Sequence, residues 1–187
     1  LVHMIREPMA LVLSAYVYHR QGNECVENPW CTDLALREPH EGVRWMAAKV
    51  LAETLPPMLW LHRMMRAAAM RGRALTLRLE NFMESSPSFD AAVRALLTHV
   101  GVPAACLALP VHRARIWDLH SAEVSPAVAH HLATHRPLGK AEQSVSWRNL
   151  TLLRAALVAN KSLWSQLSQY SLALGYPPPA REGGGIQ

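Results

Sequence analysis

The chain has 187 residues, of which 50% are hydrophobic and 18% are charged. This composition excludes a disordered or fibrous protein, and the length fits one globular domain of about 100–200 residues. No apolar run reaches the ~18–20 residues that a membrane-spanning helix needs. Nineteen Lys and Arg against fourteen Asp and Glu give a net charge of +5. The charge favours an anionic partner and leaves a phosphorylated cofactor, an acidic glycan, nucleic acid and anionic lipid open.

The sequence contains three cysteines and begins with Leu rather than Met. Cys25, Cys31 and Cys106 are too few for a disulfide framework, although their spacing allows one Cys25–Cys31 pair. Leu1 to Ile5 already reads as a buried strand, with no cap or charged leader before it. We therefore expect the sequence to be the C-terminal part of a longer protein.

The first predicted elements are a strand, a tight turn and a helix. The strand is the apolar run from Leu1 to Ile5, and Pro8 suits the first turn of a helix that continues to about Arg20. The segment 21–41 shows no sustained period and is predicted to be a long irregular loop. Loops of this length often carry function.

The middle of the chain predicts helices on both sides of a second strand. Two helices are expected between residues 42 and 69, with a break near Pro56 because a proline lacks the amide donor. Alternating leucines from Ala74 to Leu79 predict the strand. Ser86 followed by proline begins the next helix, and Gly101 ends it. Two strands that each feed a helix indicate an α/β fold.

The C-terminal third is predicted to be mostly helical. Residues 103–121 are expected to form a loop, 126–135 a short helix and 146–174 one long helix that ends at a glycine. The tail 177–187 is rich in proline and glycine and is predicted to be disordered.

Arg6 lies at the carboxyl end of the first predicted strand, where ligands of α/β sheets bind. Ser14 follows about two helical turns later. An arginine fork and a hydroxyl can hold one phosphate by charge-assisted hydrogen bonds. A paired or solvated surface arginine is the simpler alternative.

The stretch HMIREPMALVLSAYVYHR, residues 3–20, resembles the 3'-phosphate-binding motif of the sulfotransferases. That motif is a hydrophobic strand, Arg, a polar residue, Pro, a Ser eight positions after the Arg, and aromatic residues. The matching positions here are Arg6, Pro8, Ser14, Tyr16 and Tyr18.

Two downstream stretches are similar to later parts of the same family. Residues 77–82 contain the end of a predicted strand, which closes on a Glu. The helix that follows ends in Gly-Val-Pro at 101–103. Residues 144–148 read Ser-Val-Ser-Trp-Arg and precede a long helix that closes on Leu-Gly-Tyr at 174–176. Their order matches the family, so the resemblance covers roughly residues 1–176 as one sulfotransferase-like domain.

The resemblance implies a P-loop-like parallel sheet flanked by helices, present here as an incomplete, helix-rich C-terminal portion. It implies an enzyme that transfers a sulfuryl group from 3'-phosphoadenosine 5'-phosphosulfate, PAPS, to a hydroxyl or amine of a small molecule or glycan. It implies a protein of the cytoplasm or the Golgi lumen, and no nucleic-acid partner. By the same resemblance Arg6 and Ser14 hold the 3'-phosphate, and a basic loop closes over it through Arg136, Gly139 and Lys140.

The sequence departs from the family in one respect. In the family, a phosphate loop for the 5'-phosphosulfate and the usual catalytic base both lie before the motif with Arg and Ser. Neither has a counterpart here, and no Gly-x-x-x-x-Gly-Lys-Ser or similar segment occurs in the sequence. The alternative function is therefore a non-catalytic basic module that binds a polyanion.

Two other clusters carry less specific signals. His130, His131 and His135 place imidazoles at helical spacing, but zinc needs a further ligand, so no metal is predicted. Four arginines beside several methionines are either a polyanion patch or a solvated helix face, and they are Arg63, Arg66, Arg71 and Arg73.

Overall fold

A computed structural model of the protein describes residues 1–20, 29–118, 120–121 and 140–178. The chain divides into two compact units, each made of two segments. The first unit comprises residues 1–6 and 60–134, and the second comprises residues 7–59 and 135–187. The helix α4 (Leu55–Met65) runs from the second unit into the first.

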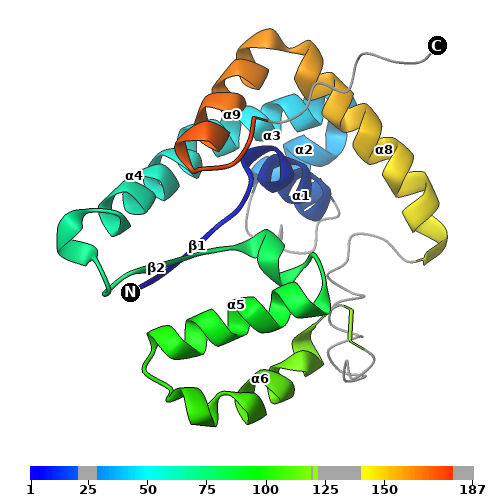
Figure 1. The fold of residues 1–187 in the computed structure, drawn as a ribbon. Helices are drawn as coiled ribbons and strands as arrows, with labels where there is room; N and C mark the ends of the chain where they lie inside the picture. The colour runs from blue at the N-terminus through cyan, green and yellow to red at the C-terminus, as the bar shows by residue number, and fades with distance from the viewer. Residues whose placement is uncertain (21–28, 119, 122–139, 179–187) are drawn as a thin grey trace, which may run out of the picture. The chain divides into compact units, whose positions relative to one another are not determined.

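The first unit contains a two-stranded parallel sheet, as the sequence predicts (Figure 1). β1 (Val2–Ile5) pairs with β2 (Leu75–Arg78), and the register aligns Val2 with Leu75 and Ile5 with Arg78. Parallel strands need a long crossover. Here α1 (Pro8–Arg20), α2 (Pro29–Leu36), α3 (Pro39–Glu53) and α4 provide it. The protein is thus a helix-rich α/β protein.

Side chains of β1 alternate between the two faces of the sheet. His3 and Ile5 are buried, whereas Val2 and Met4 are exposed. The register places Thr76 and Arg78 on the face of His3 and Ile5. The helix α5 (Ser86–His99) packs against β2 and runs alongside the strands in Figure 1.

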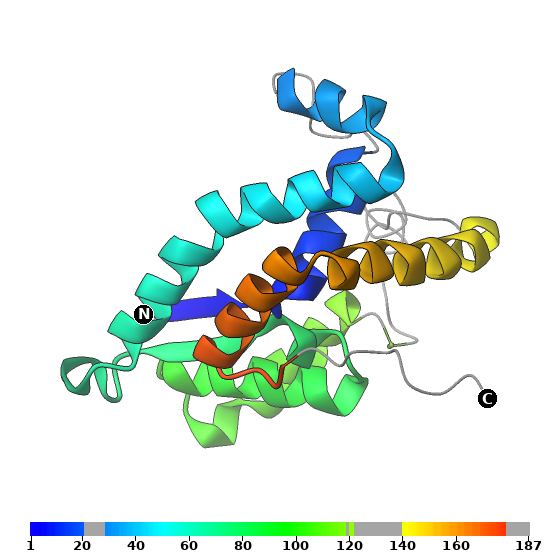
Figure 2. The same cartoon turned by 90° about the horizontal axis from the view of Figure 1, so that it is seen from above.

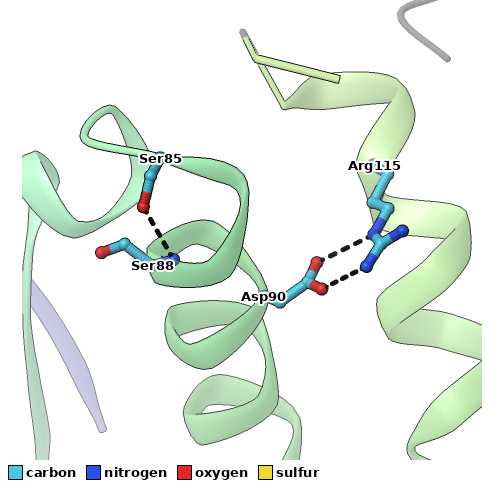
Figure 3. Close-up of polar contacts among 4 residues, drawn as sticks. All are labelled: Ser85, Ser88, Asp90 and Arg115. Atoms are coloured by element: carbon cyan, nitrogen blue, oxygen red, sulfur yellow. Dashed lines mark hydrogen bonds and ion pairs between the residues drawn. The ribbon is translucent and has the colours of Figure 1, made fainter. Parts of the chain in front are cut away.

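The helix α5 begins at Ser86 and ends before Gly101, as its sequence predicts. Ser85 is the N-cap, and its hydroxyl accepts the Ser88 amide at 3.3 Å (Figure 3). Gly101 follows the helix with φ +91°, a conformation that glycine adopts without strain.

The predicted loop at 103–121 is wrong, because it contains α6 (Ala108–Ala114). Val111 of this helix is buried with Phe89 and Val93 of α5, so tertiary packing stabilises two short turns. An ion pair adds a second link, since Arg115 donates to both carboxylate oxygens of Asp90 at 3.2 and 2.6 Å (Figure 3). These hydrogen bonds hold the pKa of Asp90 below its usual value.

The described part of this unit also contains four short 3-10 helices. They are η1 (Ala68–Met70), η2 (Leu79–Phe82), η3 (Ala104–Cys106) and η4 (Arg115–Trp117).

The second unit is helical. Besides the first part of α4 it contains α1 (Pro8–Arg20), α2 (Pro29–Leu36), α3 (Pro39–Glu53), α8 (Lys140–Ala159) and α9 (Lys161–Ala173). The helix α1 packs against α3 and α9, and α3 also packs against α8 (Figure 2). Its fully buried apolar side chains include Val12, Val43, Leu157 and Leu167.

The predicted loop at 21–41 is also wrong over its described part, because α2 and the start of α3 lie there. Cys31 and Leu34 are buried, and an eight-residue helix is too short for its period to stand out. Trp30 stacks near Trp45 with ring centroids 5.8 Å apart, so α2 docks on α3 through aromatic contact. Cys31 is disulfide-bonded, while Cys106 is a free, exposed thiol. Cys25 lies outside the described residues.

The long helix predicted at 146–174 is instead two helices, α8 and α9. Asn160 leaves the helical conformation, and its Oδ1 accepts the Leu163 amide at 3.1 Å as the N-cap of α9. The predicted end is confirmed, since Gly175 has φ +80°. The predicted helix at 126–135 and the tail from residue 179 lie outside the described residues.

Gly42 of α3 lies close to Tyr16 of α1. A methyl group at this position would lie 2.8 Å from Cε2 of Tyr16, a buried side chain. Gly42→Ala is therefore expected to destabilise the protein by roughly 1 kcal/mol, because overpacking outweighs the gain in helix propensity. Urea unfolding measures this change. The exposed Ala48→Ser on the same helix is the control, and a stabilised Gly42→Ala variant would contradict the close approach.

Candidate functional site

The predicted strand, turn and helix around Arg6 are confirmed. β1 ends at Ile5 and α1 begins at Pro8, so Arg6 and Glu7 form the connection. Arg6 is half-buried at the carboxyl end of its strand. This is the end of a parallel strand at which α/β proteins bind ligands.

Ser14 lies on α1, on the side away from the buried residues Val12 and Tyr16. Two residues along a helix correspond to a rotation of about 200°, and Ser14 is half-buried. Arg6 belongs to the first unit and Ser14 to the second. Their convergence on one phosphate stays a prediction.

Glu7 has a structural role that the sequence analysis did not find. One carboxylate oxygen accepts the Ala10 amide at 2.7 Å, and the other accepts the hydroxyl of Ser171 at 3.0 Å. Ser171 is fully buried on α9. The carboxylate therefore stabilises the N-terminus of α1 and joins it to α9. A carboxylate three residues before an amide of the first turn was the local signal for it.

Removing this link is expected to cost measurable stability. Glu7→Ala loses the helix contact and leaves the buried Ser171 hydroxyl without its acceptor, which together cost about 2–3 kcal/mol. Ser171→Ala is expected to cost about half as much, and the double variant less than the sum. Urea unfolding of the cycle measures the coupling. Additive losses would contradict the link, and Ser165→Ala, exposed on the same helix, is the control.

Tyr16, an aromatic position of the motif, is part of the core of the second unit. It is 3% exposed, and its hydroxyl accepts a hydrogen bond from Arg20. Burial raises the pKa of the Tyr16 phenol, and Arg20 opposes part of that shift. Tyr16 therefore positions α1 against α3, and this role is separate from ligand contact.

Two buried histidines, one on β1 and one on α4, lie near each other. His3 of β1 and His62 of α4 have ring centroids 6.4 Å apart. Nδ1 of His3 and both nitrogens of His62 lack a hydrogen-bond partner. Burial lowers the pKa of both imidazoles, and Arg66 and Arg78 lower that of His62 further. This pair is neutral near pH 7, and no sequence pattern indicated it.

The remaining predicted site residues lie outside the described residues or at their edge. Arg136 and Gly139 lie outside the described residues, and Lys140 is the first residue of α8. His130, His131 and His135 also lie outside them. Across the described ranges, no group of three His, Cys, Asp or Glu could hold a metal ion. A shallow groove lies elsewhere, along α5 beside Asp90 and Arg94.

Comparison with family models, with curated proteins and with solved structures returns no match for this chain. None of the helices described here has the length and apolar character to cross a membrane.

Proposed function

We propose that this chain is the part of a PAPS-dependent sulfotransferase that binds the 3'-phosphate of the cofactor, within a P-loop-like α/β domain. The observation that carries the proposal is the connection from β1 to α1. A parallel strand ends at Arg6, and a helix begins at Pro8 with Ser14 two turns later. This is the arrangement that the resemblance of residues 3–20 to the sulfotransferase motif implies.

The chemistry of the connection fits a phosphate. Arg6 presents a planar guanidinium that can donate two parallel hydrogen bonds to phosphate oxygens. The neighbouring carboxylate of Glu7 is engaged with an amide and a hydroxyl of the second unit. Hydrogen-bond donors thus offset the acidic charge next to Arg6 in the sequence.

In the proposed reaction PAPS supplies the sulfuryl group, and adenosine 3',5'-bisphosphate is the product that leaves. The bond between sulfur and the bridging phosphate oxygen breaks as a bond forms from sulfur to the acceptor, S–O for a hydroxyl and S–N for an amine. The acceptor loses its proton. Negative charge builds on the transferring oxygens, so fixed cations and amides assist most. The role of Arg6, with Ser14, is to bind and orient the cofactor by its 3'-phosphate. Arg136, Gly139 and Lys140 are proposed to close over the same phosphate.

The discriminating measurement is calorimetry with two nucleotides that differ only in the 3'-phosphate. Adenosine 3',5'-bisphosphate is expected to bind about tenfold to a hundredfold more tightly than adenosine 5'-monophosphate, because a charged hydrogen bond is worth ~1.5–3 kcal/mol. Equal affinities at matched salt would contradict the proposal.

A second candidate is a basic module that binds a polyanion without chemistry. The net charge of +5 favours it. Such a module would bind heparin with an affinity that falls steeply with salt, and it would not distinguish the two nucleotides.

A further inference from the structure

The last two turns of α4 expose an apolar surface on the first unit. Trp60 is 65% exposed and Met64 is 37% exposed. Their spacing of four residues places them on one side of the helix, with Arg63 next to them. His62 and Met65, on the other side, are each 6% exposed. The exposed side of this helix therefore carries two large apolar side chains, a tryptophan and a methionine.

The charged residues of α4 and of the segment that follows it are all of one sign. From Leu55 to Leu79 the sequence contains no Asp, Glu or Lys, but it contains five arginines. Four of them are exposed on α4 or in the turns that follow it, and they are Arg63, Arg66, Arg71 and Arg73. The exposed tryptophan and methionine thus lie in a stretch that contains several arginines and no acidic residue.

We propose that this surface, defined by Trp60, Met64 and these four arginines, docks on an anionic lipid bilayer. The tryptophan ring has an apolar body and a polar N–H, which suits the boundary between headgroups and acyl chains. Met64 adds flexible apolar contact beside it. The arginines bind the lipid phosphates, and the helix lies in the plane of the interface.

The apolar part of the surface favours a bilayer over a soluble polyanion. A sulfated glycan or nucleic acid would engage the arginines but would leave Met64 in water. A bilayer satisfies both parts, since it offers negative charge and an apolar layer at the same surface. The docking is peripheral, and it does not depend on the proposed cofactor site.

Vesicle sedimentation of the whole chain tests the proposal. Vesicles of phosphatidylcholine with about one-third phosphatidylserine are expected to bind the chain, and phosphatidylcholine alone is not. Trp60→Ala is expected to reduce partitioning into the anionic vesicles. The double variant Arg63→Gln with Arg66→Gln is also expected to reduce it, by roughly fivefold or more for each arginine removed.

The chain offers a matched control on the same unit. Trp117 is 57% exposed, and Arg113, four residues before it, is also exposed. Trp117→Ala with Arg113→Gln removes the same kinds of side chain and is expected to leave vesicle binding unchanged. Circular dichroism checks that all variants are folded.

Three results would overturn the proposal. The first is equal binding to neutral and anionic vesicles, or no binding to either. The second is unchanged vesicle binding by Trp60→Ala while the arginine pair loses heparin and vesicle binding alike, which would identify a polyanion surface. The third is a dimer by size exclusion that Trp60→Ala converts to a monomer, which would identify a second copy as the occupant.

Discussion

Replacing Arg6 with alanine is expected to weaken the binding of adenosine 3',5'-bisphosphate about tenfold to a hundredfold. The reason is that a charge-assisted contact to phosphate is lost, while truncation of a half-buried side chain at a strand end opens no core cavity. Calorimetry at matched salt measures the affinity, and thermal unfolding shows that the variant remains folded.

Two further variants make this result specific to the site. Arg6→Lys keeps the charge but loses the planar fork, so it should restore only part of the affinity. Arg113→Ala removes an exposed arginine of the same unit and should leave the affinity unchanged. Wild-type affinity in Arg6→Ala would remove the cofactor site. An equal loss of affinity in Arg6→Ala and Arg113→Ala would indicate general charge attraction.

The free energy of unfolding is expected to fall as the pH drops below about 6.5, and His3 and His62 are the cause. Their pKa values are lower in the folded protein than in the unfolded chain. The unfolded chain therefore binds more protons in this window, and stability that is present above pH 6.5 is lost as the pH falls through the folded-state values. Protonation would also place charge beside Arg66 and Arg78.

Urea unfolding across this pH range, compared with His62→Leu, isolates the pair from the other histidines. The leucine removes two buried nitrogens that lack partners, so it is expected to stabilise the protein by on the order of 1 kcal/mol at acidic pH and by less at neutral pH. His40→Gln changes an exposed side chain and should keep the wild-type pH dependence. An unchanged slope in His62→Leu would show that the pair does not control acid stability.

The two predicted loops that contain helices, at 21–41 and 103–121, are wrong for the same reason. The helix α2 has eight residues, and α6 has seven, so neither spans enough turns for a helical period to be recognised. Both form because they bury side chains against longer helices, Cys31 and Leu34 in one case and Val111 in the other. Tertiary packing decides the structure of such short segments.

Around Arg6, too, local patterns predicted some features and contacts between distant residues decided others. The strand, the turn and the helix that begins at Pro8 follow from local patterns, and so did their likeness to a phosphate-binding motif. The role of Glu7 does not, because its partner Ser171 lies 164 residues away. Nor does the His3–His62 pair, which a strand and a crossover helix bring together.

The sequence by itself determined the elements that local physics specifies. Alternating leucines define β2, Pro8 begins α1, and Gly101 and Gly175 end helices because their backbone conformation has positive φ. Only the tertiary structure decided which of these elements pair and which polar groups are buried together. Such contacts join residues far apart in the chain, and their energy depends on burial and orientation, which no local pattern encodes.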